Sequence, residues 1–175
     1  MARNIEIKAR IADAAALAHN VASLADRGPV EILQDDTFFH CERGRLKLRT
    51  FSATAGELIF YQRMDQAGPK ESVYVIAPTS APDALREALM LAYGARGRVR
   101  KRRTLYMAGR TRIHLDEVES LGHFLELEVV LAEGEPAAAG VAVAHALLRG
   151  LEIDPHQLVE GAYVDLLAQR RHGHA

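Results

Sequence analysis

The chain has 175 residues, of which 49% are hydrophobic and 26% charged, and these values are typical of a folded domain rather than a disordered chain. Its 22 Lys and Arg nearly balance its 23 Asp and Glu. This balance excludes nucleic-acid binding through bulk charge and requires any anion site to come from locally clustered basic residues. The single cysteine excludes an internal disulfide. The first residues, MARNIEIKAR, contain no apolar run, so we expect no signal peptide, no membrane partner and a cytoplasmic location.

The first half of the chain is predicted to form a strand, a helix and a four-stranded meander. Residues 3–11 alternate Ile with charged residues, which is the period of a strand. Asp13 is placed to cap an Ala- and Leu-rich helix that ends near residues 26–29. Gly-containing turns then separate strands predicted at residues 30–41, 44–51, 57–65 and 70–76. Residues 77–80, which include Pro78, are expected to end the meander.

The second half adds helices and three more strands. A helix is predicted at about residues 81–93, and strands follow at about 98–107, 110–118 and 123–131. Pro136 opens a third helix that runs to about residue 148, a short helix follows Pro155, and residues 162–169 form another. Strands joined mainly by hairpins, together with these helices, indicate an α+β fold. We predict a single domain over residues 1–175, a closed eight-stranded antiparallel β-barrel with flanking helices.

Ionisable residues recur in these strands at the spacing i, i+2, which places them on one face of a strand. The residues between them are mostly apolar, as Leu46 and Leu48 show for the second basic strand. The sets are Glu6, Lys8 and Arg10; Arg45, Lys47 and Arg49; Tyr61 and Arg63; Lys101 and Arg103; Arg112, His114 and Asp116; and Glu126 and Glu128. Each of these strands therefore has one charged face.

Two interpretations of the charged faces are open. An antiparallel sheet with one apolar face buried and one charged face in water is the common case. Against it, the faces sort by sign, with acids on the first and last strands and bases between them, and Arg dominates while Ser and Thr are scarce. Arg is favoured where phosphate oxygens are bound bidentately. We therefore favour a barrel whose charged faces point inward.

A charged interior requires a charged ligand. Several Arg and Lys in one cavity repel each other unless an anion neutralises them. Carboxylates in the same cavity form ion pairs or bind a divalent cation through their oxygens. A polyphosphate with Mg²⁺ or Mn²⁺ satisfies both sets of residues.

Six segments, in order along the chain, resemble the CYTH group of triphosphate tunnel metalloenzymes, and within it the class IV adenylyl cyclases more than the thiamine triphosphatases. They are residues 4–8 (NIEIK), 44–49 (GRLKLR), 61–63 (YQR), 100–106 (RKRRTLY), 112–130 (RIHLDEVESLGHFLELEVV) and 161–167 (GAYVDLL). The resemblance covers nearly the whole chain. It implies an eight-stranded antiparallel tunnel that binds the triphosphate of a nucleotide or a similar substrate.

Carried onto these positions, the resemblance implies three sets of site residues. The phosphate-binding set is Lys8, Arg49, Arg63, Lys101 and Arg103, with Lys47, Arg45 and Lys70 as weaker candidates. The metal-binding set is Glu6, Glu126 and Glu128, and the catalytic set is Glu6, Lys8, Asp116 and Glu126. The family's first glutamate is Asn4 here. An amide oxygen coordinates a hard cation without adding charge, so we expect a weaker or shifted metal site.

The resemblance leaves three functions open. The first is a class IV adenylyl cyclase-like reaction, in which ATP gives cyclic AMP and pyrophosphate. The second is a triphosphatase of the same fold, acting on inorganic triphosphate, thiamine triphosphate or a nucleoside triphosphate. The third is a non-catalytic nucleotide or polyphosphate binding module, which Asn4 favours. The chain is expected to be a monomer or a homodimer.

Three further features allow two interpretations each. His114 is either a lining histidine held by Asp116 or a catalytic base. The basic run at residues 96–103 could bind nucleic acid, but strand alternation should turn the Arg residues at its even positions outward into water. Tyr163 either closes one end of the tunnel or packs in the core.

Overall fold

The computed structural model describes residues 2–172, and residues 1 and 173–175 lie outside the described part. The strands are β1 (Ala2–Ile11), β2 (Arg27–Phe39), β3 (Arg45–Ser52), β4 (Ala55–Arg63), β5 (Lys70–Thr79), β6 (Ala95–Ala108), β7 (Thr111–Val118) and β8 (Gly122–Val130). The helices are α1 (Ala14–Leu24), α2 (Pro82–Tyr93), α3 (Ala137–Gly150) and α4 (Tyr163–His172), with a short 3₁₀ helix at Pro155–Gln157.

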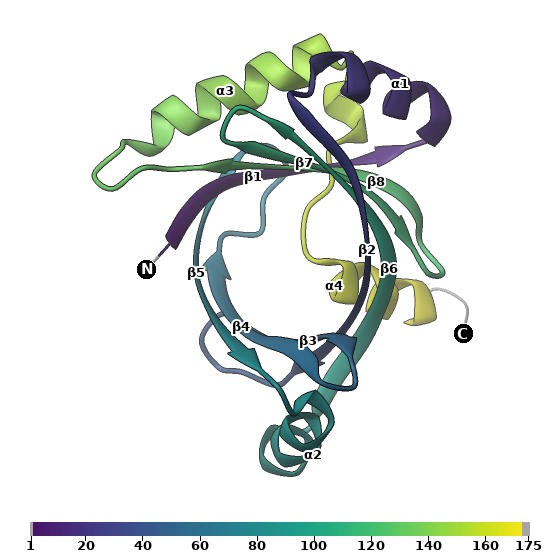
Figure 1. The fold of residues 1–175 in the computed structure, drawn as a ribbon, viewed down its shortest axis with the longest axis vertical. Coiled ribbons are helices and arrows are strands. Elements are labelled where there is room, and N and C mark those ends of the chain that lie inside the picture. The colour runs from purple at the N-terminus through teal and green to yellow at the C-terminus, as the bar shows by residue number, and fades with distance from the viewer. Residues whose placement is uncertain (1, 173–175) are drawn as a thin grey trace.

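The strands close into one barrel in the order β1-β5-β4-β3-β2-β6-β7-β8, and all neighbours are antiparallel. Figure 1 shows the ring of strands seen along its axis. The predicted α+β class and the closed eight-stranded antiparallel barrel are confirmed. Closure depends on β1, which pairs with β5 on one side and with β8 on the other.

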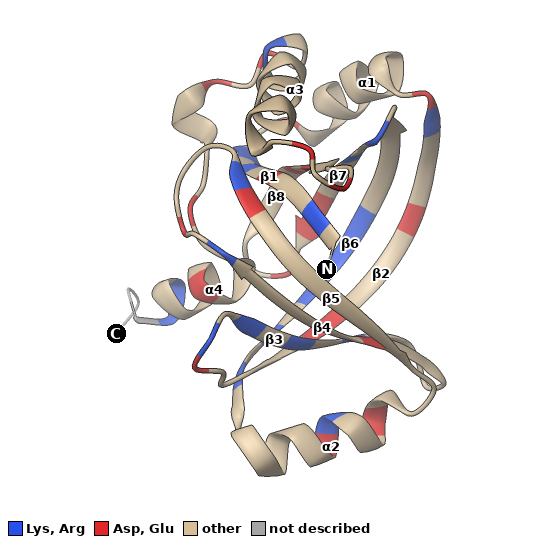
Figure 2. Ribbon diagram, turned by 90° about the vertical axis from the view of Figure 1, so that its left-hand side faces the viewer, with Lys and Arg blue, Asp and Glu red and all other residues tan. Residues whose placement is uncertain are grey.

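Alternation along the strands separates a charged interior from an apolar exterior. On β1, Glu6 and Lys8 line the barrel cavity, whereas Ile5 and Ile7 belong to apolar clusters outside it. Side chains at i and i+2 share a face, so a single period-2 pattern produces both surfaces. Figure 2 shows Lys, Arg, Asp and Glu distributed along the strands.

Helices α1 and α3 cover the apolar outer face of β1, β7 and β8 (Figure 1). Val21 of α1 and Leu148 of α3 pack with Ile113 and Leu127 of the sheet. A Cβ atom on Gly140 of α3 would lie 2.6 Å from Ile5 Cγ1, so glycine allows the helix to approach β1 closely. Burial of this outer face leaves the opposite face of the same strands to the barrel interior.

The start of α4 covers one end of the barrel. Tyr163 and Val164 pack with Phe38, Val99 and Phe124 in an apolar cluster, and the Tyr163 and Phe124 rings meet edge to face at 5.0 Å. Tyr163 also lines the cavity. Both interpretations of Tyr163 therefore hold together, since the ring is a core residue on one side and the floor of the tunnel on the other.

Some boundaries differ from the predicted ones, most clearly at the end of β5. The strand continues through Pro78 to Thr79, beyond the predicted end at residue 76. Past Tyr74, β5 is paired with β4 but no longer with β1 among the described residues. A proline is tolerated on such an edge because its missing N–H faces no partner. The prediction treated Pro78 as a terminator and was wrong there.

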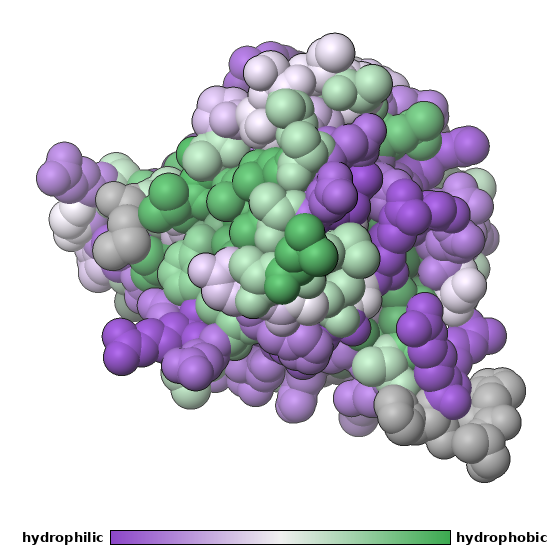
Figure 3. All heavy atoms as spheres, turned by 90° about the horizontal axis from the view of Figure 1, so that it is seen from below, coloured by the Kyte–Doolittle hydropathy of each residue, from purple (hydrophilic) through white to green (hydrophobic). Residues whose placement is uncertain are grey.

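The surface around α2 is partly apolar. Met90, Leu91 and Tyr93 are exposed on this helix, and Figure 3 shows apolar atoms gathered on the side of the molecule seen from below, where α2 lies. None of the described helices is both long enough and apolar enough to cross a membrane. The expected cytoplasmic location and the expected monomer or homodimer stay predictions.

Candidate functional site

A cavity of about 260 Å³ lies inside the barrel and collects most of the predicted site residues. Its lining includes Glu6, Lys8, Lys47, Arg49, Arg63, Lys101, Arg103, Glu126 and Glu128. Asn4, His114 and Tyr163 also line it. Charged residues far apart in the sequence thus share one enclosed space, as the inward-facing interpretation requires.

A buried acid that the sequence analysis missed organises the cations of β3. Asp36 on β2 accepts from Lys47 Nζ at 2.9 Å and from Arg49 Nε and Nη2 at 2.8 Å each, and Lys101 Nζ lies 3.9 Å away. Burial alone would raise the pKa of Asp36, but Lys47 and Arg49 hold it well below its usual range. The expected sorting of strands by sign is therefore incomplete. The signal available was Asp36 alternating with Gln34 and Phe38 within the predicted strand.

Arg103 occupies the centre of a second charged group. It donates to Asp116 at 2.7 and 2.6 Å and to Glu126 Oε2 at 2.7 Å, while the Tyr163 hydroxyl donates to Asp116 Oδ2 at 2.9 Å. Burial opposes ionisation of Asp116, but Arg103 and Lys101 lower its pKa to about 2. Asp116 is thus ionised at neutral pH beside Arg103. This geometry supports a role in positioning Arg103, and the catalytic role expected for Asp116 stays a prediction.

Two lysines lie over the Tyr163 ring at the closed end. Lys8 Nζ is 3.9 Å and Lys101 Nζ 5.1 Å from the ring centroid, and Lys8 also donates to the Gly161 carbonyl at 3.2 Å. Burial is the main cause that lowers the pKa of Lys8 to about 8 and that of Lys101 to about 7. A bound polyanion would favour the charged form of both.

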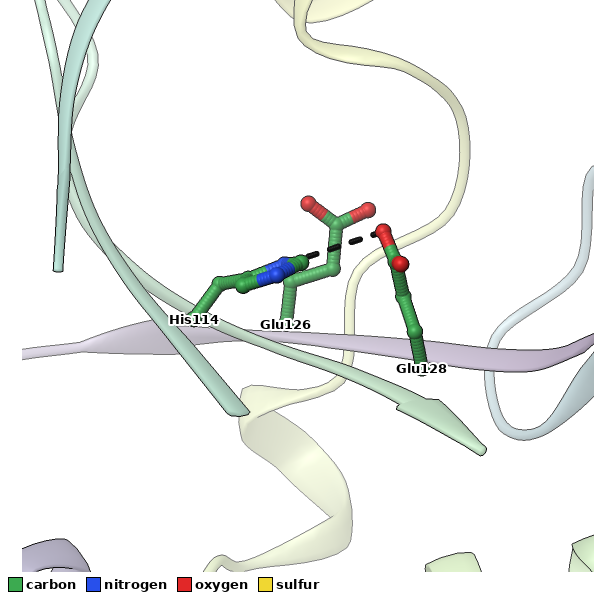
Figure 4. Close-up of side chains that lie close together, drawn as sticks. All are labelled: His114, Glu126 and Glu128. Atoms are coloured by element: carbon green, nitrogen blue, oxygen red, sulfur yellow. Dashed lines mark ion pairs between the residues drawn. The ribbon is translucent and has the colours of Figure 1, made fainter. Parts of the chain in front are cut away.

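The acidic side of the cavity is formed by β1, β7 and β8. Glu6 is paired with Arg63, and Arg112 donates to Glu128 Oε2 at 2.8 Å. One ligand atom from each of His114, Glu126 and Glu128 lies within 4.8 Å of the other two. Figure 4 shows these three side chains turned toward one another in the cavity. Among the described residues, Glu6 is not part of this group.

The acidic side of the cavity also holds two buried polar atoms that lack a hydrogen-bond partner among the described residues. Asn4 Oδ1 and His114 Nδ1 are buried and belong to cavity-lining residues, and neither has a hydrogen-bond partner among residues 2–172. Burial, and then Arg103, hold the pKa of His114 well below its usual range, so the imidazole is neutral. Neutral imidazole, carboxylate and amide oxygen are all metal ligands. The residues present therefore fit a divalent cation.

The remaining candidates lie outside the cavity lining. Arg45 pairs with Asp65 and Asp165 at 2.5 and 2.8 Å, and Lys70 donates to the Gln66 carbonyl. The arginines at positions 98, 100 and 102 are exposed, as strand alternation predicted. Asp116 accepts from Arg103 and Tyr163, and its expected role in holding His114 stays a prediction.

Comparison with known proteins identifies the family. A model of the CYTH domain matches residues 2–163, whereas no curated protein matches the sequence. Among solved structures, the PH1012 protein of Pyrococcus horikoshii OT3 has 21% identity and a TM-score of 0.83, with 93% of this chain and 98% of that chain covered. A candidate adenylate cyclase from Vibrio parahaemolyticus has 17% identity and a TM-score of 0.73, with coverage of 94% and 97%.

A third solved structure, a candidate adenylyl cyclase from Hippeastrum with a dominant triphosphatase activity, has 14% identity and a TM-score of 0.63, with 98% of this chain and 96% of that chain covered. At such identities the similarity establishes the fold alone. The family follows from the domain model, which spans almost all of the described residues. The chain therefore belongs to the CYTH-domain family of triphosphate tunnel metalloenzymes.

Proposed function

We propose that this protein is a class IV adenylyl cyclase-like enzyme, which converts ATP to cyclic AMP and pyrophosphate with Mg²⁺ or Mn²⁺. The observation that carries the proposal is the meeting of phosphate-type cations and metal-type carboxylates in one cavity. Arg49, Arg63 and Arg103 face the same space as Glu126 and Glu128. A triphosphate with a divalent cation is complementary to both groups.

The two ends of the tunnel differ, and the difference favours an organic triphosphate. Tyr163 closes one end beneath Lys8 and Lys101. Val118 of β7 belongs to the apolar cluster around Tyr163. Arg112 lies six residues earlier on the same strand, so these two residues are roughly 20 Å apart. Its side chain is 35% exposed, and the half-exposed Ile76 lines the cavity as well. Phosphates drawn toward the lysines would leave a nucleoside at this more open, partly apolar end.

The same orientation places the reacting phosphorus near the carboxylates. Glu128 is paired with Arg112 and so lies between the lysines and the open end. An α-phosphate at this level is next to the residues that would hold the metal. A cyclase needs its metal there, since the ribose 3′-oxygen attacks the α-phosphorus and the bond to the bridging oxygen breaks, releasing pyrophosphate.

The protein groups would divide the work between binding and charge stabilisation. Glu126 and Glu128 would hold the metal, which when bound neutralises phosphate charge and promotes attack by the hydroxyl oxygen. Arg49 and Arg103 would bind the β- and γ-phosphates and stabilise charge on the departing pyrophosphate. Asp36 and Asp116 hold these guanidinium groups in place before substrate arrives, so little reorganisation accompanies the reaction.

A triphosphatase is the second candidate. The Hippeastrum structure, with its dominant triphosphatase activity, has the same fold. Hydrolysis needs the same cations and carboxylates but a triphosphate in the opposite orientation or placed deeper, so that the metal adjoins the terminal phosphorus. The polarity of this tunnel favours the cyclase.

Product analysis tests the proposal directly. The protein is incubated with ATP, inorganic triphosphate or thiamine triphosphate, each with Mg²⁺ or Mn²⁺, and products are identified by ³¹P NMR and chromatography. Cyclic AMP and pyrophosphate are expected from ATP. Orthophosphate from any substrate would select the triphosphatase, and binding without turnover would select a non-catalytic module.

A further inference from the structure

We infer that the imidazole of His114 is itself a ligand of the tunnel metal, beside Glu126 and Glu128, and that the site therefore selects a transition-metal dication such as Mn²⁺ over Mg²⁺. The resemblance implied Glu6 as the third ligand and no histidine. The inference deepens the proposed function, because it concerns the metal of the same cavity. It rests on three observations about His114 and its neighbours.

The first observation is distance. His114 Nδ1 lies 3.6 Å from Glu128 Oε1, and the potential ligand atoms of His114, Glu126 and Glu128 are all within 4.8 Å of one another (Figure 4). Metal–ligand bonds of about 2.1 Å place the ligands of one ion roughly 3 to 4 Å apart. The widest pair in the cluster needs to contract by roughly 1 to 2 Å. Such a change is small for side chains that share one cavity.

The second observation is the unsatisfied nitrogen. The His114 side chain is only 4% exposed, and within the described part of the chain Nδ1 has no hydrogen-bond partner. A buried polar atom without a partner costs about 1–3 kcal/mol. The neighbouring Arg112 binds the other oxygen of Glu128, Oε2, so Oε1 and Nδ1 face each other across a gap too wide for a hydrogen bond. A dication between them satisfies both atoms.

The third observation concerns the acid expected to complete the site. Glu6 is paired with Arg63, as Glu126 is with Arg103 and Glu128 with Arg112, but among the described residues Glu6 does not belong to the group of close ligand atoms. The neighbouring position on β1, where the family has an acid, is the neutral Asn4. The β7–β8 register instead sets His114 directly opposite Glu126. The structure thus brings an imidazole to the carboxylate pair of β8 from the adjacent strand.

Replacing one oxygen ligand by imidazole changes the choice of metal. Mg²⁺ prefers oxygen ligands in near-ideal octahedral geometry, whereas imidazole suits first-row transition metals. Affinity at a mixed nitrogen and oxygen site rises from Mn²⁺ to Co²⁺. We therefore expect the substrate-free protein to bind Co²⁺ and Mn²⁺ more tightly than Mg²⁺, by at least about tenfold.

Direct metal binding tests the inference without any turnover. Mn²⁺ is titrated into the substrate-free protein and followed by EPR, with Mg²⁺ as competitor, and pulsed EPR detects the ¹⁴N coupling of a directly bound imidazole. Coupling is expected in the wild type. His114→Ala should abolish it and lower Mn²⁺ affinity by about tenfold or more, while Mg²⁺ affinity changes little. His123→Ala, at an exposed histidine of β8, is the matched control.

The measurement on the wild type needs no variant, so a folding defect in His114→Ala does not obscure the answer. Absence of Mn²⁺ binding, or binding without ¹⁴N coupling, would overturn the inference. Coupling without cyclic AMP formation would keep the histidine ligand and remove the cyclase. Cyclic AMP formation without ¹⁴N coupling would support the cyclase and overturn the histidine ligand.

Discussion

Two walls of the tunnel are built on different principles. The basic wall, formed by Lys47, Arg49 and Lys101, is arranged around the buried carboxylate of Asp36. The acidic wall is formed by Glu126 and Glu128 with His114 and Asn4 beside them. Its atoms His114 Nδ1 and Asn4 Oδ1 have no hydrogen-bond partner in the part of the chain that the structure describes. The basic wall is arranged around an internal carboxylate. The acidic wall, although Arg103 and Arg112 bind its two glutamates, still has polar atoms available to coordinate a cation.

The difference reflects the ligand that each wall suits. Buried cations without an acid among them would be strongly destabilised in the absence of phosphate, so an internal carboxylate is needed to keep them charged and oriented. Metal ligands have the opposite requirement, because their lone pairs must be free to coordinate. This tunnel therefore orients its anion-binding side chains around Asp36 and leaves potential metal ligands available.

The largest expected effect lies on the acidic wall. Glu126→Gln removes the carboxylate that faces Lys8 and Arg103 and one charge from the metal site, so activity should fall by about 100-fold or more. Metal affinity, measured by calorimetry, should fall with it. Glu117→Gln, at an exposed acid on β7, is the control and should leave both unchanged. Retention of most activity in Glu126→Gln would place the metal elsewhere.

A substitution in the basic wall should change the stability of the protein rather than its metal affinity. Asp36→Asn leaves Lys47 and Arg49 without their shared anion, so the free energy of unfolding should fall by about 3 kcal/mol. Excess inorganic triphosphate should restore much of this loss, because it binds only the folded state. Chemical denaturation with and without triphosphate measures both effects.

The neighbouring residue supplies the matched control for that variant. Asp35 pairs with Arg98 on the outer face of the same strands, where an exposed pair contributes less than about 1 kcal/mol. Asp35→Asn should therefore change stability little and show no rescue beyond that of the wild type. Equal losses in the two variants would mean that Asp36 does not neutralise the basic wall.

The lysines at the closed end predict that protein stability and triphosphate affinity depend on pH in opposite directions. Lys101, with a pKa of about 7, and Lys8, with a pKa of about 8, lose protons in the folded protein while unfolded lysines keep theirs to about pH 10. Between about pH 7 and 10 the unfolded state binds more protons, so stability without ligand should rise with pH.

Triphosphate affinity should move the other way across the same range. A bound polyanion requires charged lysines, so affinity should fall by up to about tenfold per pH unit for each proton taken up. Thermal unfolding and calorimetric titration with inorganic triphosphate follow the two quantities. Lys101→Met should flatten both curves, and a steeper fall of affinity in this variant would contradict the assignment.

The smallest effect is expected at Asn4, where the chain departs from its family. Asn4→Glu adds a charged oxygen near Glu128, and the metal concentration for half-maximal activity should fall by about fivefold. Asn4→Gln, which has the length of Glu without its charge, is the control. An unchanged or higher metal requirement in Asn4→Glu would show that the acidic wall is already complete with a neutral residue there.

Much of the fold and of the candidate site could be predicted from local pattern. Period-2 alternation is a property of each strand alone, so the inward faces of β1, β3 and β8 were predicted with their residues, among them Glu6, Arg49 and Glu126. Motif order then indicated the family. The end of β5 was missed because Pro78 is acceptable only where a neighbouring strand is lacking, and pairing is not visible in a strand by itself.

The sequence by itself determined which residue types face the interior, since that depends on neighbours two positions apart. Only the tertiary structure decided which of them meet. Cross-strand register paired Asp36 with Arg49 and His114 with Glu126, and barrel closure brought β1 beside β8. A shift of one residue in any register would turn these side chains outward. Strand pairing therefore decides which charged side chains meet inside the barrel. The paired strands are far apart in the sequence, so the pattern within one strand cannot predict these partners.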